Sequence, residues 1–332
     1  MSMSPLLEIK GLKKHFTINR GIVDAIMRKP PRVLKAVDGV SLEIYAGESL
    51  GIVGESGCGK STLAKTLIRL YKPDGGSIHL DGRDISHISP KEMRDEARNI
   101  QMIFQDPYSS LNPRMSVRQT LSEALTFHNL CTPEEMEERI LELMGLVGLY
   151  DYQADRMPSD FSGGQRQRIG IARALALEPK LIIADEPVSA LDVSIQAQII
   201  NLLIDLRNKL GLTVIFISHD LRVVKYITNR VAVMYLGKIM ELAETHELFE
   251  TPRHPYTSIL IQAAPSIEEE FTWNSELIHG ELPSPMNPPS GCLFHPRCPY
   301  AKEICSQVEP GFVEISKGHF ASCHFPLSPC SG

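Results

Sequence analysis

The stretch SLGIVGESGCGKST, residues 49–62, joins a short apolar run to a glycine-rich loop and a helical pattern. Residues 49–53 are typical of a buried parallel strand, and the spacing from Leu63 onward is helical. The Gly-x4-Gly-Lys-Ser loop between them lets backbone N–H groups face an anion at a helix N-terminus. We expect Lys60 to contact the β and γ phosphates of a nucleotide and Ser61 to ligate Mg²⁺. The predicted site comprises Gly54, Glu55, Ser56, Gly57, Cys58, Gly59, Lys60, Ser61 and Thr62.

Two further apolar runs end in polar residues suited to nucleotide chemistry. KLIIADEP, residues 180–187, ends in Asp185 and Glu186, and LTVIFISHD, residues 212–220, ends in His219. Alone, such endings also fit a strand-to-loop boundary or a structural histidine. Because open α/β sheets bind ligands at the carboxyl ends of their strands, we expect these side chains near the phosphate loop. Asp185 is then expected to hold Mg²⁺ and Glu186 to orient or deprotonate the attacking water.

The segment DFSGGQRQRIGIARAL, residues 160–175, lies between these pieces, and with it the chain resembles an ATP-binding cassette (ABC) ATPase. Ser162, Gly163, Gly164 and Gln165 match the family signature, with Phe161 where leucine is more usual. A serine and two glycines that open a helix make a second anion site. The resemblance implies that this site binds the ATP of the opposite subunit, so that two cassettes enclose two ATP molecules.

Other positions take their expected roles from the resemblance alone. Gln105, in MIFQDP, matches the residue that contacts Mg²⁺ and the attacking water, and His219 matches the residue that holds the γ phosphate. Residues 189–192, Ser-Ala-Leu-Asp, match the segment that crosses the dimer interface. Phe16 stands where the family stacks an aromatic ring on adenine, although it equally suits the core of an N-terminal sheet.

The resemblance also implies an architecture. The fold class is α/β, an ABC nucleotide-binding domain with a RecA-like phosphate-loop core around a mainly parallel sheet. An antiparallel β subdomain precedes this core, and an α-helical subdomain is inserted at about residues 106–160. We expect the ATPase domain to span residues 1–265, and residues 266–332 to form a linker and a small metal-bound extension. A proline cluster at 282–289 fits the linker.

Two segments resemble the oligopeptide and dipeptide branch of ABC importers: FQDPYSSLNPR at 104–114 and RHPYTSILIQAAP at 253–265. The branch implies a homodimer or a heterodimer with a paralogous cassette, two membrane permease subunits and an extracytoplasmic peptide-binding protein. Related cassettes serve nickel or sugars, and a soluble ABC ATPase outside transport is the other alternative. No residue of the chain indicates the solute.

Four cysteines gather near the C-terminus: Cys292, Cys298, Cys305 and Cys323, separated by five, six and seventeen residues. In a reducing compartment they favour metal binding over disulfides. Spacing alone leaves Zn²⁺ and a 4Fe-4S cluster equally open. The resemblance favours the 4Fe-4S cluster. From sequence we expect this site to be independent of ATP binding, so that Cys298→Ser loses the cluster's brown colour but still binds ATP.

Composition limits the remaining function classes. The 332 residues are 43% hydrophobic with a net charge of -6, which does not indicate nucleic-acid binding. No run approaches the length of a membrane-spanning helix, so we expect a peripheral protein on the cytoplasmic face of the cell membrane. A basic insertion at 17–36 suits either a solvated loop or an approach to lipid headgroups.

Overall fold

The structure is a computed structural model that describes residues 4–18, 32–263 and 283–328. Most of the basic insertion and the linker from residue 266 to residue 282 lie outside the described residues, as does Cys330. The chain divides into two compact units. The first comprises residues 1–44, 50–87 and 219–332, and the second comprises residues 45–49 and 88–218. The predicted domain boundary at residue 265 remains a prediction.

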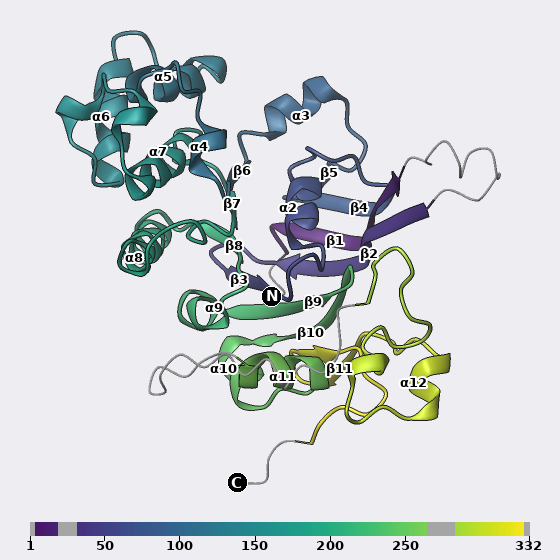
Figure 1. Cartoon of the computed structure of the whole chain (residues 1–332). Coiled ribbons are helices and arrows are strands. Elements are labelled where there is room, and N and C mark those ends of the chain that lie inside the picture. The colour runs from purple at the N-terminus through teal and green to yellow at the C-terminus, as the bar shows by residue number, and fades with distance from the viewer. Residues whose placement is uncertain (1–3, 19–31, 264–282, 329–332) are drawn as a thin grey trace, which may run out of the picture. The chain divides into compact units, whose positions relative to one another are not determined.

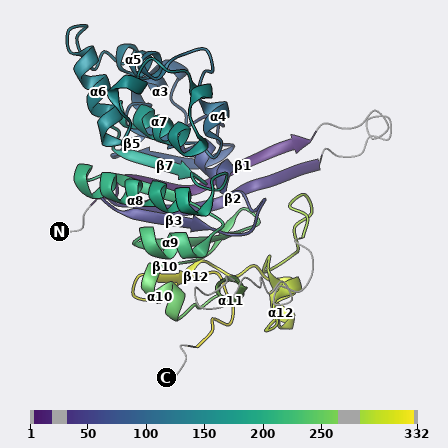
Figure 2. The same ribbon diagram turned by 60° about the vertical axis from the view of Figure 1, so that its left-hand side comes forward.

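Unit 1 contains two sheets. One is antiparallel with strand order β2-β1-β4-β5, and the other has the order β11-β12-β10-β9-β3, with β3 parallel to β9 and the remaining pairs antiparallel. The long β1 and β2 ribbon stands out in both views (Figures 1 and 2). The strands are β1 (Leu7–Ile18), β2 (Arg32–Ile44), β3 (Ser49–Val53), β4 (Gly75–Leu80), β5 (Arg83–Asp84), β9 (Arg230–Tyr235), β10 (Lys238–Glu244), β11 (Val313–Ser316) and β12 (His319–Ala321).

Helices of unit 1 flank these strands. The helix α2 contacts β1 and β2, and α10 and α11 contact β10. Their bounds are α2 (Lys60–Leu67), α9 (Leu221–Ile227), α10 (Thr245–Glu250), α11 (Pro255–Ala263), the short turn η4 (His295–Arg297) and α12 (Glu303–Gln307).

Unit 2 combines three parallel strands with a set of helices. The strand order is β8-β7-β6, and α7 contacts β6 as well as α4, α5, α6 and α8. Both views show α5, α6 and α7 gathered together (Figures 1 and 2). The elements are α3 (Pro90–Glu96), β6 (Ile100–Ile103), α4 (Pro107–Ser110), α5 (Val117–Phe127), α6 (Met136–Leu146), η1 (Asp151–Gln153), η2 (Pro158–Asp160), α7 (Gly163–Leu175), β7 (Leu181–Asp185), α8 (Val193–Leu210) and β8 (Thr213–Ile217).

Continuous apolar runs explain the central strands. Every residue of β3, β7 and β8 is buried, as a strand covered on both faces requires. These are the three strands that the sequence predicts. None of the helices within the described ranges is long and apolar enough to cross a membrane.

The helix after the phosphate loop differs from its predicted range. The apolar pattern predicts a start near Leu63, whereas α2 begins at Lys60, directly after Gly59. It ends at Leu67 because Arg69 has a left-handed backbone with φ of 62°. The earlier start places Lys60 and Ser61 in the first helical turn, where free N–H groups favour an anion.

The C-terminal extension is part of unit 1. The strand β12 pairs with β10 through Glu241 opposite Ala321 and Leu242 opposite Phe320. His319, the first residue of β12, is fully buried and bonds two carboxylates. Its Nε2 lies 2.6 Å from Oε1 of Glu241, and its Nδ1 lies 2.9 Å from Oε1 of Glu247. Burial lowers the pKa of His319, but the two carboxylates outweigh this effect and hold the pKa above its usual value.

This histidine gives the extension a pH-dependent attachment. The folded state binds the His319 proton more tightly than the unfolded state does. Protonated His319 therefore contributes fully to the stability of the folded state below about pH 6.5. We expect that contribution to be lost as pH rises through the folded pKa. Hydrogen exchange at the Leu242 and Phe320 amides should therefore accelerate as pH rises above 6.5, beyond the intrinsic base effect. A His319→Gln variant should lack this additional acceleration, and equal protection ratios in both proteins would contradict the assignment.

Candidate functional site

The phosphate-binding loop runs from the end of β3 to the start of α2. Gly59 has φ of 112°, and a Cβ atom there would lie 2.0 Å from the backbone oxygen of Ala36. Gly54 has φ of 152°, and its Cβ would lie 2.1 Å from the oxygen of Met234. Both glycines are thus required by neighbouring backbone as well as by the loop's own turn.

Lys60 lies across this loop. Its Nζ donates to the carbonyl oxygens of Gly54 at 2.8 Å and Glu55 at 3.1 Å, and the residue is 5% exposed. The loop is also held by Gly237, whose N–H donates to the carbonyl oxygen of Cys58 at 2.8 Å. Burial raises the pKa of the Cys58 thiol, so this cysteine packs as a neutral side chain. Residues 49–67 form the predicted strand, loop and helix arrangement, with the loop between β3 and α2.

Glu186 follows the last residue of β7 in a backbone conformation that the sequence does not reveal. Asp185 ends the strand with 3% exposure, and Glu186 then has φ of 47°, a region that residues other than glycine seldom occupy. The turn is held by the N–H of Glu186, which donates to Ile217 at 2.9 Å, and by Ser189, whose hydroxyl donates to the Glu186 carbonyl at 3.1 Å.

Gln105 contacts this carboxylate directly. Its Nε2 donates to Oε2 of Glu186 at 2.9 Å and to the hydroxyl of Ser189 at 3.3 Å. The sequence expects Gln105 and Glu186 to act on the same water, and the structure brings their side chains together. Gln105 is exposed and Glu186 is partly exposed, so water reaches both.

The signature residues open α7 as the sequence predicts. Ser162 is the N-cap, and its hydroxyl accepts from the N–H of Gln165 at 3.3 Å while Oε1 of Gln165 accepts from the N–H of Ser162 at 3.0 Å. Gly164 has a second role that the sequence does not indicate. A Cβ atom there would lie 2.4 Å from Cγ2 of Ile195 in α8, so this glycine also allows the two helices to pack closely.

The remaining ATP-site predictions are distributed over both units. Phe16 lies in β1, where its ring meets Tyr71 edge to face at 5.3 Å and Lys14 lies over it at 5.2 Å. His219 is exposed in the turn before α9. Unit 1 thus holds the phosphate loop, Phe16 and His219, whereas unit 2 holds Gln105, Asp185, Glu186 and the signature. Their meeting at one nucleotide remains a prediction.

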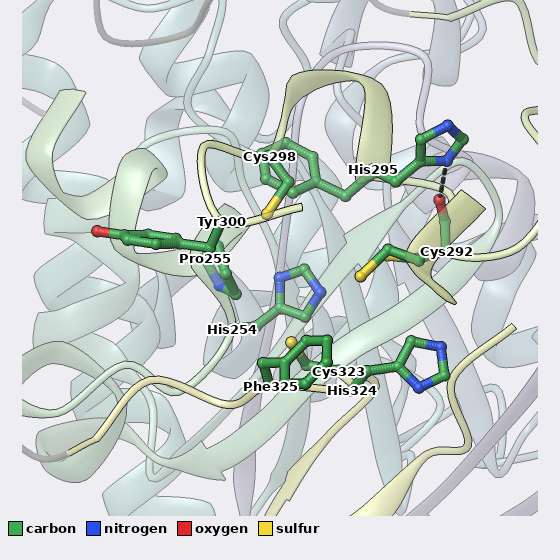
Figure 3. Close-up of a pocket in the computed structure, with 11 residues that line it drawn as sticks. His254, Pro255, Cys292, His295, Cys298, Tyr300, Cys323, His324 and Phe325 are labelled. Atoms are coloured by element: carbon green, nitrogen blue, oxygen red, sulfur yellow. Dashed lines mark hydrogen bonds between the residues drawn. The ribbon is translucent and has the colours of Figure 1, made fainter. Parts of the chain in front are cut away.

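The four C-terminal cysteines line one cavity in unit 1. The sulfur atoms of Cys292, Cys298 and Cys323 surround the His254 ring in Figure 3, and Cys305 lines the same cavity. Burial raises the pKa of Cys292 and Cys298 and raises that of Cys323 to about 11, so these thiols are neutral at pH 7. Among the described residues, no three histidine, cysteine or acidic side chains group closely enough to hold a metal ion.

His254, from the HPYT motif at 254–257, is also buried at this cavity. Its Nδ1 accepts from the N–H of Tyr256 at 3.0 Å, the ring is buried, and the backbone of Ser322 is a second hydrogen-bonding neighbour. Burial lowers the pKa of His254 to about 4, so the ring is neutral and carries its proton on Nε2. Sequence reasoning assigns this motif no chemistry, because four residues do not reveal that the turn faces the cysteines.

The phosphate loop has two partners that sequence reasoning misses. Tyr256 accepts at its hydroxyl from the N–H of Glu55 at 3.0 Å, and Nη1 of Arg297 donates to the Glu55 carboxylate at 2.9 and 3.2 Å. Both partners are more than 200 residues from Glu55 in the chain, and no local pattern links them.

Comparisons with known proteins agree with this site. Residues 37–189 match the family described as ABC transporter, and residues 240–305 match the oligopeptide/dipeptide transporter C-terminal region. The chain is 54% identical to the oligopeptide transport ATP-binding protein AppF of Bacillus subtilis over 322 residues, covering 96% of this chain and 97% of AppF. It is 51% identical to OppF of Salmonella typhimurium over 321 residues, covering 96% and 95%.

Solved structures show the same fold. The dimeric post-hydrolysis structure of the ATP-binding cassette MJ0796 with ADP and phosphate matches with a TM-score of 0.63 at 29% identity, covering 72% of this chain and 98% of that one. CbiO1 of Clostridium perfringens matches with a TM-score of 0.62 at 30% identity, covering 74% and 91%.

The phosphate loop, the Gln105 and Glu186 pair and the signature helix define an ABC-type ATPase. With the matches along nearly its whole length, the chain belongs to the ABC transporter family, in the branch that carries the oligopeptide/dipeptide C-terminal region. The predicted cassette fold is confirmed.

Proposed function

We propose that the chain hydrolyses ATP to power the import of dipeptides or oligopeptides through a membrane ABC transporter. The observation that carries this proposal is the match to oligopeptide transport ATP-binding proteins over 96% of the chain. It includes the C-terminal region that is particular to that branch. Import of nickel or a sugar by the same ATPase cycle is the second candidate, because the solute is chosen outside this chain.

In the proposed reaction, residues 54–62 bind the phosphates of ATP. Lys60 exchanges its carbonyl partners for the β and γ phosphate oxygens, and His219 contacts the γ phosphate. Glu186 accepts a proton from the attacking water, while the Gln105 amide that donates to Glu186 holds the carboxylate and the water in line.

Ser61, Gln105 and Asp185 would hold Mg²⁺, and their oxygen atoms are the donors that this ion prefers. When bound, the ion neutralises charge on the β and γ phosphates.

The proposed working unit is a dimer. In it Ser162, Gly163, Gly164 and Gln165 of one chain contact the ATP of the other, and ATP binding closes the two cassettes while hydrolysis reopens them. The partner is either a second copy of the chain or a paralogous cassette. We further propose two permease subunits, an extracytoplasmic peptide-binding protein and a peripheral position on the cytoplasmic face of the membrane.

Cys292, Cys298, Cys305 and Cys323 would hold a 4Fe-4S cluster. Four thiols that line one cavity match the donor set of such a cluster, in which each iron takes one cysteine. Zn²⁺ held in a tetrahedron by the same four thiolates is the alternative. We favour the cluster because of the resemblance to the oligopeptide and dipeptide branch.

Anaerobic affinity purification from detergent-solubilised native membranes tests the transport function. We expect two polytopic permeases, a second cassette and a peptide-binding lipoprotein to copurify with the chain. A nickel-binding or sugar-binding protein in place of the peptide-binding one would move the proposal to the second candidate. Ribosomal or nucleic-acid partners without any permease would contradict transport and leave only the ATPase.

A further inference from the structure

Glu55, the second residue of the phosphate-binding loop, is held by a side chain from the cysteine-bearing segment. Arg297 lies one residue before Cys298, and its side chain is 4% exposed. Its Nη1 donates to both carboxylate oxygens of Glu55, at 2.9 and 3.2 Å, and approaches the hydroxyl of Tyr235 at 3.3 Å. Arg297 is buried and Glu55 is partly exposed, and a charge-assisted bond between them is stronger and more directional than one between two exposed side chains.

The backbone of Glu55 is fixed as well. Its N–H donates to the Tyr256 hydroxyl at 3.0 Å, and its carbonyl accepts from Nζ of Lys60 at 3.1 Å. Glu55 is therefore held through its side chain, its N–H and its carbonyl. One of these bonds is made by the lysine that is proposed to bind the phosphates, so the Glu55 carbonyl helps to hold the Lys60 amine beside the loop until the phosphates replace it.

An aromatic cluster connects these contacts to the cysteine cavity. The rings of Tyr235, Tyr256 and Phe294 lie 4.7 to 5.6 Å apart, centroid to centroid. Phe294 also lines the cavity and lies 5.9 Å from the His254 ring. The residues that hold Glu55 and those that line the cavity thus share one packed core, in which a shift of one side moves the other.

We propose that Arg297 and Tyr256 are positioning residues of the phosphate-binding loop, through which the C-terminal cysteine segment sets the affinity of the chain for nucleotide. This inference rests on the proposed ATPase function and deepens it. It also replaces the expectation from sequence that the cysteine site and ATP binding are independent. Holding Glu55 arranges the loop and Lys60 before nucleotide arrives, which lowers the ordering cost of binding.

A double-mutant cycle tests the proposal, with the dissociation constant for Mg-ATP of the purified full-length chain as the readout. We expect Arg297→Met and Glu55→Gln each to weaken binding about tenfold, which corresponds to ~1.4 kcal/mol. The double variant should bind no more weakly than either single variant, because both changes remove the same contact. Arg297→Lys retains the charge but has a shorter side chain that does not place its nitrogen where Nη1 lies, and should recover part of the affinity. Tyr256→Phe removes the bond to the Glu55 N–H and should also weaken binding.

Whether Glu55→Gln weakens or tightens Mg-ATP binding distinguishes a positioning role of Glu55 from a purely electrostatic effect of its charge. If Glu55 acted only by repelling phosphate, its removal would tighten binding and the double variant would return to the wild-type affinity. Tighter binding by Glu55→Gln, or unchanged binding by both single variants, would overturn the proposal. If Arg297→Met fails to fold by thermal melting, then Glu55→Gln and Arg297→Lys decide the result.

Glu309→Gln provides a matched control. Glu309 lies in the C-terminal segment and forms an ion pair with Lys238 of β10. Among the described contacts, neither of these two residues bonds the phosphate loop. We expect this variant to bind Mg-ATP as the wild type does. Tenfold weaker binding by the control would show a general loosening of the segment, which contradicts a specific role for Arg297. Failure of the wild type itself to bind ATP would instead contradict the proposed function.

Discussion

Replacing Glu186 with glutamine is expected to slow ATP hydrolysis by roughly 10²–10⁴-fold while leaving ATP affinity close to that of the wild type. The glutamine side chain keeps the shape of glutamate and an oxygen that accepts from Gln105, so the turn after β7 is preserved. What it loses is the basic oxygen that is proposed to take the proton of the attacking water. Steady-state phosphate release and equilibrium ATP binding measure the two effects separately.

Glu138→Gln is a suitable control, because Glu138 is an exposed glutamate of α6 at a distance in sequence from every predicted ATP-site residue. It should hydrolyse ATP at the wild-type rate. Hydrolysis by Glu186→Gln within a few fold of the wild type would remove this residue from the role of general base. A loss of ATP binding would instead assign Glu186 to the structure of the turn.

Replacing Cys298 with serine is expected to reduce the iron content of anaerobically purified protein from about four atoms per chain to near zero. In the proposed cluster, serine would leave one iron without its thiolate, and the incomplete cluster would be readily lost. Iron and sulfide analysis with the visible absorption spectrum provides the measurement. Because cluster loss also frees the core around Phe294, we now expect ATP affinity to fall in this variant.

Cys131→Ser is the matched control for the iron measurement. Cys131 lies in unit 2, with its sulfur 3.8 Å from that of Met136, and it does not line the cysteine cavity. This variant should retain its iron. Iron retained in full by Cys298→Ser would refute this ligand, and zinc in stoichiometric amount in the wild type would replace the cluster with the alternative metal.

The parts predictable from sequence are those that depend on local spacing. The buried strands at 49–53, 181–185 and 213–217 follow from unbroken apolar runs, and the start of α7 follows from a serine and two glycines that open a helix. The link between Gln105 and Glu186 came from family resemblance, because no physical rule connects positions 81 residues apart.

Other features depend on distant packing, which a single sequence does not specify. Glu186 has a left-handed backbone conformation, which residues other than glycine seldom adopt. Two hydrogen bonds hold it there, one from its N–H to Ile217 and one from the Ser189 hydroxyl to its carbonyl. The attachment of Arg297 to Glu55 spans 242 positions. Arginine and glutamate are both common on surfaces, so nothing in their neighbourhoods marks them as a buried pair.

The pairing of β12 with β10 also bears on the solubility of shortened forms of the chain. A polypeptide ending near residue 265 would retain every ATP-site motif but would lose β11 and β12, leaving the backbone groups of β10 without their neighbour. Glu241 would also lose its hydrogen bond to the buried His319. An uncovered edge of apolar residues such as Leu242 invites pairing with other molecules. We therefore expect the C-terminal segment to limit self-association by covering this edge of β10, whatever the cysteines bind.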